Sequence, residues 1–202
     1  MRPGRIILFL LFSVSLLMAV EPLDSLKKNL KNLKTFQADF VQNKTIASLQ
    51  YTMRADGEIA LERSGRLAWR VRNPIHYLCL ITESSLTQWD ADSNQTIRLD
   101  VKNSPALKFL LESMKNYFSG NFTEMEKDFR ITIPDPKTIR LVPQAGTAAS
   151  NFIQKMEFTP SPGAECIEGV TIYEAGGDIT RIEYKNIRIN REIPAEKWKS
   201  GN

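Results

Sequence analysis

The residues able to perform acid–base or nucleophilic chemistry are few and show no catalytic spacing. The chain has 202 residues and a single histidine, His76, so a Ser-His pair would have to use it, and no second imidazole could share a zinc ion with it. Asp90 and Glu62 are the carboxylates that an exported enzyme acting on lipids or glycans could use. We interpret His76 as structural and predict that the protein is not an enzyme, with the exported enzyme as the rival hypothesis.

One segment has the opening of a calcium-binding loop. Residues 90–95 read Asp-Ala-Asp-Ser-Asn-Gln, but an EF-hand loop needs glycine at its sixth position and glutamate at its twelfth, where this chain has Gln95 and Val101. We therefore interpret the segment as a turn between two strands. Since the sequence also lacks a His/Cys cluster and a glycine-rich phosphate loop, it predicts neither a metal nor another cofactor.

The two cysteines, Cys79 and Cys166, lie far apart in the sequence. An exported protein meets an oxidising environment, in which a disulfide can form. Cys79 also lies within the apolar stretch 77–81, where a thiol would pack against its neighbours without a bridge. The sequence leaves both alternatives open.

The first twenty residues have the layout of a secretory signal peptide. Arg2 and Arg5 precede fifteen uncharged residues, 6–20, and Glu21-Pro22 ends the run. A membrane-spanning helix needs about 20 apolar residues, so cleavage is the preferred interpretation and an uncleaved anchor is the alternative. We predict a signal peptide over 1–20 and one exported domain over 21–202.

The exported chain is close to electrical neutrality. Removing the leader leaves 25 basic against 23 acidic residues, a net charge of +2. Nucleic-acid binding asks for a concentrated basic face, so we expect no nucleic acid as a partner. Roughly 180 residues suffice for one domain with a substantial core.

Two stretches have the apolar spacing of amphipathic helices. In the first, lysines lie between apolar residues at intervals of three, four and seven, namely Leu23, Leu26, Leu30, Leu33 and Phe40. In the second, Pro105 stands in the first turn and Gly120 ends the helix. Its apolar face consists of Leu107, Leu110, Leu111, Met114 and Phe118.

Elsewhere, from Leu49 onward, the apolar period is two. The segments predicted as strands are 58–62, 67–72, 77–82, 87–90, 95–101, 129–133, 138–142, 152–158, 166–174 and 179–189. Apolar positions that alternate with polar ones are typical of an antiparallel sheet with one solvated face. The predicted fold is α+β: a long antiparallel sheet whose apolar face is covered by helices, with a cavity between them.

Arg63 is the exception to this pattern. It shares the parity of Ile59 and Leu61, so a continued alternation would point it toward the apolar face. A buried charge there needs acceptors such as the carbonyl groups at a helix end. In the alternative, the hairpin turns before Arg63 and the guanidinium reaches water.

Three motifs, in a consistent order over about residues 23–190, resemble the LolA family of periplasmic carriers of outer-membrane lipoproteins. Residues 36–42 (Phe-Gln-Ala-Asp-Phe-Val-Gln) are similar to the family's Phe-x-Ala-x-Phe-x-Gln at the end of its first helix. The second motif comprises 63–70 (Arg-Ser-Gly-Arg-Leu-Ala-Trp-Arg), Asn73-Pro74, 86–90 (Leu-Thr-Gln-Trp-Asp) and Gln95. The third, 176–184, resembles the closing strands.

The resemblance implies a curved, incomplete antiparallel β-barrel covered by a helical lid, with an apolar cavity that takes acyl chains. It also implies that Arg63 bonds to the lid backbone and latches the empty carrier closed, and that Trp69 lines the cavity. Together with strand parity and the helix stripes, this gives a predicted cavity lining of Phe36, Phe40, Leu67, Trp69, Leu80, Trp89, Leu110 and Met114.

The predicted function is therefore that of a monomeric periplasmic carrier that binds lipoprotein acyl chains and moves them from the inner to the outer membrane. Its expected partners are an inner-membrane donor complex and an outer-membrane acceptor. The middle of the chain, 105–129, resembles more distant LolA-like proteins, so a carrier of a glycolipid or polyene lipid is the alternative within the class.

Overall fold

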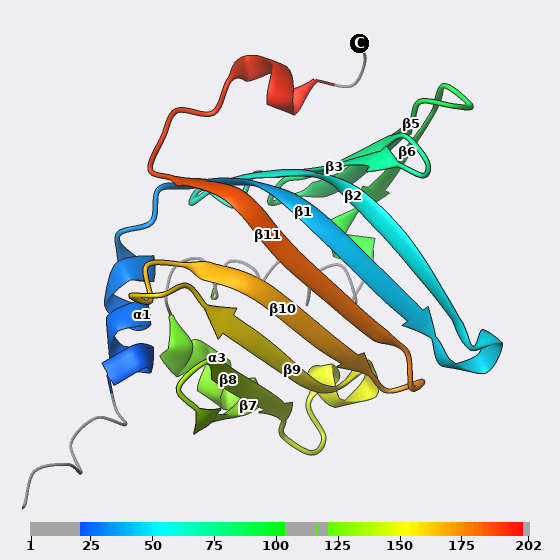
Figure 1. Ribbon diagram of the computed structural model, residues 1–202. Helices are drawn as coiled ribbons and strands as arrows, with labels where there is room; N and C mark the ends of the chain where they lie inside the picture. The colour runs from blue at the N-terminus through cyan, green and yellow to red at the C-terminus, as the bar shows by residue number, and fades with distance from the viewer. Residues whose placement is uncertain (1–20, 104–115, 117–120, 200–202) are drawn as a thin grey trace, which may run out of the picture.

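The computed structural model describes residues 21–103, 116 and 121–199. Its main feature is one antiparallel sheet of eleven strands in the order β6-β5-β4-β3-β2-β1-β11-β10-β9-β8-β7. The sheet curls into a half-barrel whose outermost strands, β6 and β7, are not paired with each other (Figure 1). This confirms the predicted α+β class and the incomplete antiparallel barrel with helices covering it.

The strands are β1 (Thr35–Ile46), β2 (Tyr51–Glu62), β3 (Leu67–Asn73), β4 (Tyr77–Ile81), β5 (Ser85–Asp90), β6 (Gln95–Asp100), β7 (Phe129–Asp135), β8 (Thr138–Pro143), β9 (Ile153–Pro160), β10 (Ile167–Glu174) and β11 (Ile179–Ile189). The α-helices are α1 (Glu21–Lys31) and α3 (Phe122–Asp128). Short 3-10 turns are η1 (Ala47–Leu49), η2 (Val101–Asn103), η3 (Ala148–Asn151) and η4 (Ala195–Trp198). The predicted strands are thus confirmed.

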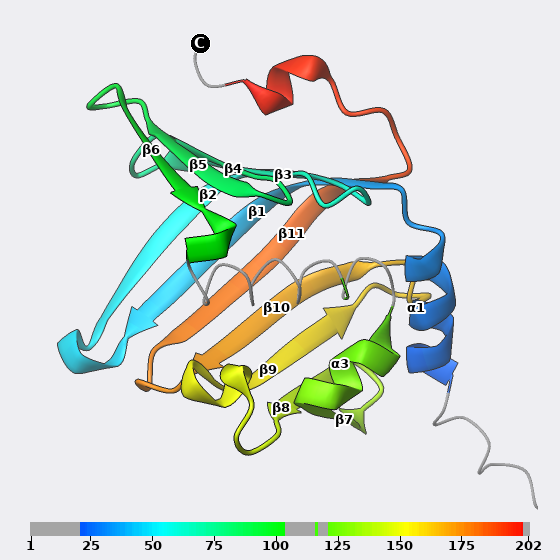
Figure 2. The same ribbon diagram turned by 180° about the vertical axis from the view of Figure 1, so that it is seen from behind.

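Within β1–β6 and within β7–β11, consecutive strands are antiparallel neighbours, so their connections alternate between the two ends of the half-barrel. We call the end that holds the β1–β2, β3–β4 and β10–β11 turns the mouth. Helix α1 stands at the other end, where Asn29 donates a hydrogen bond of 2.9 Å to the carbonyl oxygen of Ala164 in the β9–β10 turn. Figures 1 and 2 show α1 at this end and α3 beside β7 and β8.

The first helix is shorter than its apolar stripe predicted. It ends at Lys31, and Phe40 lies in β1, not in the helix. From Thr35 the apolar residues Phe36, Ala38 and Phe40 alternate with polar ones, and pairing with β2 and β11 satisfies both edges of this segment. The second predicted helix, 105–120, and the predicted signal peptide, 1–20, lie outside the described residues.

Helix α3 was missed by the sequence analysis. The side chain of Asn121 caps it by accepting a hydrogen bond of 3.4 Å from the backbone N–H of Glu124. Phe122 and Met125 on its buried face join the main apolar cluster. Among the described residues, no helix has both the length and the apolarity needed to cross a membrane.

The sheet buries apolar side chains on both of its faces. The larger cluster lies on the concave face and includes Leu26 and Leu30 from α1. A smaller cluster lies on the convex face, where Ala60, Ala68 and Leu78 meet Ile193 and Trp198. These last two belong to residues 190–199, here called the C-terminal segment, which runs over the outer face of the sheet (Figure 1).

Candidate functional site

The concave face carries an aromatic surface built by the period of two along its strands. Phe40 of β1, only 1% exposed, stacks on Trp69 of β3 with ring centroids 3.8 Å apart. Phe36 meets Tyr184 of β11 edge-on at 5.5 Å. Aromatic contacts of this kind add to the stabilisation from burial. The result is a continuous apolar wall across four adjacent strands.

Four residues of the predicted cavity lining lie together in this concave cluster. They are Phe36, Phe40, Leu67 and Trp69. The strand alternation in β1 and β3 is clear enough to assign their face. That they contact a lipid stays a prediction, and Leu110 and Met114 lie outside the described residues.

Leu80 and Trp89 do not line the concave face, so this part of the predicted lining was wrong. In the β3–β4 ladder Trp69 is opposite Cys79, which places Leu80 on the other side of the sheet. Trp89 is opposite Leu78, and both Leu80 and Trp89 pack in the convex cluster. For Leu80 the reason is that β4 is apolar at every position, so the sequence does not show which of its residues face the concave side. Trp89 lies in β5, where Leu86 faces the concave cluster and Trp89 has the opposite parity.

Several concave residues were missed by the sequence analysis. The second half of the sheet contributes Met156 and Phe158 from β9 and Ile182 and Tyr184 from β11 to the concave cluster or its edge. Their alternation with charged residues was a usable signal. Burial of Tyr184 raises the pKa of its hydroxyl, which therefore stays protonated on this apolar surface.

Near the mouth the concave face becomes polar. Lys44 Nζ lies 2.8 and 3.1 Å from the two carboxylate oxygens of Glu174 and 3.6 Å from Asp178. Thr180 donates a further hydrogen bond of 3.1 Å to Glu174. The hydrogen bond with Glu174 raises the pKa of Lys44. This cluster ties β1 to the β10–β11 turn beside the opening.

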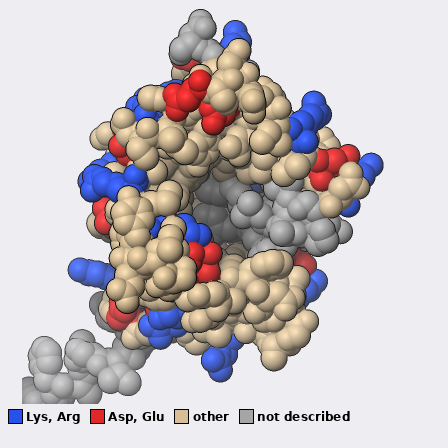
Figure 3. Space-filling model, turned by 90° about the vertical axis from the view of Figure 1, so that its right-hand side faces the viewer, with Lys and Arg blue, Asp and Glu red and all other residues tan. Residues whose placement is uncertain are grey.

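Exposed large apolar side chains gather at the turns of the mouth. Leu49 is 68% exposed, and Tyr51, Ile75 and Phe152 are also exposed. They belong to or adjoin the β1–β2, β3–β4 and β8–β9 connections. Figure 3 looks toward this end and shows a hollow bordered by residues other than Lys, Arg, Asp and Glu along its upper edge, with basic and acidic residues at its lower left edge.

Arg63 lies one residue beyond β2 and is exposed. The hairpin therefore turns before Arg63, as in the second of the two alternatives for its position. Its guanidinium nevertheless donates a hydrogen bond from Nη1 to the carbonyl oxygen of Lys31, the last residue of α1. Its backbone N–H also bonds to the carbonyl oxygen of Lys34, at 2.8 Å. Arg63 thus joins the β2–β3 turn to the end of α1.

The residues considered for catalysis are not brought together. Glu62 ends β2 at the α1 end, whereas Asp90 ends β5 at the mouth. Asp90 accepts a hydrogen bond of 2.8 Å from the backbone of Ser93 in the predicted turn, and bonds of this kind lower the pKa of its carboxyl. His76 is exposed beside Asp92, at 3.4 Å.

The possible metal ligands and the two cysteines are also separate in the described part of the chain. Among the described residues there is no group of three or more His, Cys, Asp or Glu side chains that could hold a metal ion. Cys79 and Cys166 are both free thiols, so the alternative without a bridge is the one observed. Burial raises the pKa of Cys79 to about 11.

These features define an open antiparallel half-barrel with an apolar concave face, an architecture suited to holding an apolar ligand. The chain belongs to the family described as outer membrane lipoprotein carrier protein LolA, which matches residues 31–200. An outer-membrane lipoprotein carrier protein of Legionella pneumophila (strain Paris) is 25% identical over 191 residues, covering 95% of this chain and 90% of that protein. One of Coxiella burnetii (strain RSA 493) is 22% identical over 171 residues, covering 83% and 77%.

Solved structures share the fold at lower identity. The MucA/MucB complex of Pseudomonas aeruginosa matches with a TM-score of 0.54 and 10% identity, over 89% of this chain and 60% of that chain. An uncharacterized conserved protein from Thermus thermophilus matches with a TM-score of 0.51 and 13% identity, over 90% and 93%.

Proposed function

We propose that this protein is a periplasmic carrier that holds the acyl chains of lipoproteins against its concave face and moves them from the inner to the outer membrane, without catalysis. The observation that carries the proposal is the aromatic and aliphatic wall around Phe40 and Trp69 in a half-barrel of the LolA family. The names of the relatives from Legionella and Coxiella support the same function.

The energetics of a reversible carrier give α1 and Arg63 a role. Each buried CH₂ group of a cargo contributes about 0.8 kcal/mol, so two or three acyl chains would bind far too tightly to be released. The free energy needed to open the closed carrier must therefore offset much of the free energy gained by burying the acyl chains. The bond from Arg63 to the final carbonyl of α1 supports a latch that makes opening costly in the empty carrier.

The mouth is the proposed route of entry and release. Exposed apolar residues there, including Leu49 and Phe152, would meet an inner-membrane donor complex and then an outer-membrane acceptor. We propose that the carrier works as a monomer, because a partner copy at this end would compete with both.

The experiment that tests the proposal is recovery of the mature protein from the periplasm, followed by mass spectrometry of what copurifies. Bound acylated protein supports a lipoprotein carrier. A bound glycolipid or polyene lipid would instead identify the protein as a carrier of that lipid, the alternative within the same class. An empty protein that turns over a lipid or glycan would overturn the proposal in favour of an enzyme.

A transfer assay from donor to acceptor vesicles completes the test. Neither a chelator nor His76→Ala should slow transfer, since no metal ion and no acid–base step is involved. His76 is exposed, so its replacement should leave the fold intact. A large loss of transfer in either case would contradict a carrier that works by burial alone.

A further inference from the structure

The carbonyl groups at the C-terminal end of α1 fall into two sets. The last carbonyls of a helix lack an intrahelical partner and take one from a tightened last turn, a side chain or water. The carbonyl oxygen of Lys28 accepts a hydrogen bond of 3.2 Å from the side chain of Asn32. Those of Asn29 and Leu30 each accept a bond of 3.0 Å from the backbone N–H three residues further on. These three bonds move with the helix, so they do not fix its position on the sheet.

The next two carbonyl oxygens along the chain accept hydrogen bonds from residues at the ends of strands. That of Lys31 accepts from Nη1 of Arg63. That of Asn32 accepts from Nδ2 of Asn190, at 3.3 Å. Arg63 directly follows β2 and Asn190 directly follows β11, so two separate parts of the sheet reach the same turn of chain. Both bonds must break when α1 moves away from the sheet.

Asn190 is also bonded to the strand side of the connection between α1 and β1. Its Oδ1 accepts a hydrogen bond of 2.7 Å from the backbone N–H of Lys34. Its own backbone N–H donates to the carbonyl oxygen of Thr35, the first residue of β1, at 2.9 Å. Arg63 has the same arrangement, since its backbone N–H bonds to the carbonyl oxygen of Lys34. Each of the two residues therefore joins the helix to the strand across residues 32–34, where α1 would hinge.

The backbone holds Asn190 in the position that these bonds need. Its φ is 56°, in the left-handed region, where asparagine is tolerated better than most residues with a Cβ. The hydroxyl of Thr35 donates a hydrogen bond of 2.6 Å to the carbonyl oxygen of the following residue, Arg191. Gln37 donates one of 3.1 Å to the carbonyl oxygen of Glu192. Figure 1 shows the C-terminal segment leaving β11 here, beside the chain that joins α1 to β1.

We propose that Asn190 is a positioning residue of the closed carrier, a second latch that holds α1 on the sheet together with Arg63. The proposal rests on the carrier function proposed above, because a latch has a role only if α1 opens. A helix of 11 residues is too short to persist once it leaves the sheet, so opening also frees its backbone amides. Control of opening thus extends from the β2–β3 turn to the first residue of the C-terminal segment.

Hydrogen–deuterium exchange of the empty mature protein tests the proposal, because the amides of α1 report its detachment. Asn190→Gly keeps the left-handed backbone but loses both side-chain bonds, so exchange of these amides should accelerate by about fivefold or more. Asn190→Asp keeps an acceptor for Lys34 but cannot donate to Asn32, and should accelerate exchange by about threefold or more. Parental exchange in Asn190→Asp would overturn the proposal, because the lost donor is the group that reaches the helix.

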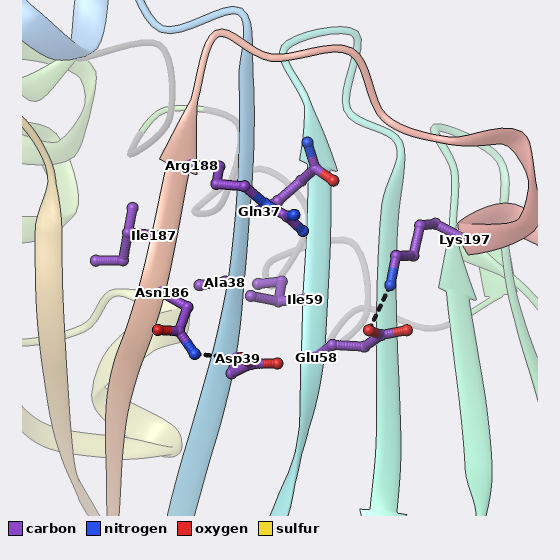
Figure 4. A pocket seen from close by; sticks show the side chains of 9 residues that line it. All are labelled: Gln37, Ala38, Asp39, Glu58, Ile59, Asn186, Ile187, Arg188 and Lys197. Carbon is purple, nitrogen blue, oxygen red and sulfur yellow. Dashed lines mark hydrogen bonds and ion pairs between the residues drawn. The ribbon is translucent and has the colours of Figure 1, made fainter.

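Asn186→Gly is the matched control. Asn186 lies in β11 and has a φ of 52°, so glycine changes the freedom of the unfolded chain in the same way as at position 190. Its side chain donates a hydrogen bond of 2.7 Å to Asp39 in the lining of a pocket on the convex face (Figure 4). Exchange in α1 should therefore stay parental. Equal acceleration by the two glycine variants would refute a specific role for Asn190.

A double variant shows whether Asn190 and Arg63 restrain the same movement. If both hydrogen bonds break in one opening of α1, Asn190→Gly combined with Arg63→Leu should accelerate exchange by about the product of the two single effects. A double variant that exchanges no faster than the faster single variant would mean that the two residues restrain different motions. That result would remove Asn190 from the latch.

Release of cargo to acceptor vesicles connects the exchange data with transport. Asn190→Gly should slow release, whereas Asn186→Gly should not, and release at the parental rate from Asn190→Gly would overturn the second latch. The two proposals fail separately. Faster exchange of α1 in a protein that is recovered without acyl chains would contradict the carrier function but keep Asn190 as a residue that holds α1. Parental exchange in a protein that carries lipoprotein would remove only the role of Asn190.

Discussion

Phe40 of β1 and Trp69 of β3 stack across the strand that separates them, with their ring planes inclined by 23°. The stack is possible because β2 has Gly57 opposite Phe40 in the ladder. A Cβ atom at this position would lie 2.8 Å from Cζ of Phe40 and 1.9 Å from the carbonyl oxygen of Arg70. The concave aromatic wall therefore depends on the absence of a side chain in the strand beneath it.

Gly57→Ala should destabilise the protein by about 3 kcal/mol, because the added methyl group must displace backbone as well as the Phe40 ring. Urea unfolding followed by circular dichroism measures the change in the free energy of unfolding. Gly176→Ala is the matched control, since a Cβ there meets no atom within 4 Å. Equal stability of the two variants would contradict the close packing described for Gly57.

The three tryptophans should respond differently to an apolar ligand. Trp69 lies on the concave face, whereas Trp89 and Trp198 pack in the convex cluster. In variants that keep one tryptophan and replace the others by phenylalanine, a brominated fatty acid should quench Trp69 strongly and the other two weakly. Quenching of Trp89 as strong as that of Trp69 would place the ligand elsewhere.

The strands could be predicted from the sequence because one face of most of them is solvated, which makes the period of two visible. The face assignment failed where both faces are buried. Leu78 and Leu80 of β4 are as apolar as Cys79 and Ile81, and their cover comes from Ile193 and Trp198 in a polar-looking C-terminal segment. The sequence of β4 alone therefore does not show that the C-terminal segment covers its convex face.

The boundary of α1 failed for a related reason. Leu26, Leu30 and Leu33 continue at helical spacing into Phe40, so the stripe extended past the true end of the helix at Lys31. The competing alternation of Phe36, Ala38 and Phe40 wins because β1 is paired on both sides, with β2 and β11. Such tertiary pairing overrides a local helical period.

Arg63→Leu should slow the release of bound cargo to acceptor vesicles. The hydrogen bond to Lys31 stabilises the closed, empty carrier. Without it, closing after release regains less free energy, so less of the free energy lost when the acyl chains leave is offset. Because Arg63 is exposed, the free energy of unfolding should change by no more than about 0.5 kcal/mol. Arg130→Leu, which replaces an exposed arginine of β7, controls for the loss of a positive charge. Release at the parental rate would show that Arg63 is not a latch.

Cys79 should make the protein less stable at high pH. Burial raises the pKa of its thiol from 9.0 to about 11, so between these values the unfolded chain releases a proton that the folded chain keeps. Stability therefore falls as the pH rises through this window. Cys79→Ala should reduce that fall in thermal unfolding curves recorded from about pH 8 to about pH 11, a range that begins below the ordinary pKa of a thiol.

Alkylation provides a direct check on the same thiol. In a Cys166→Ala background, the rate of reaction with iodoacetamide should rise with pH toward about 11 in the folded protein, and at lower pH in urea. Since both cysteines are free, the parent should take up two adducts when unfolded without a reductant. The same dependence of the alkylation rate on pH in the folded and the urea-unfolded protein would contradict the buried environment of Cys79.

The unpaired edges of the sheet have a consequence for the range of cargo. Strands β6 and β7 are its two outermost strands and follow one another in the described part of the chain. The distance between them can change without breaking any interstrand backbone hydrogen bond. In a closed barrel the hydrogen-bonded ladders fix the circumference. We expect this open sheet to accommodate ligands of different cross-section with little difference in the free energy of opening. If ligands enter at the mouth as proposed, we expect discrimination among them to come from the polar groups around Lys44 and Glu174, which lie beside that opening.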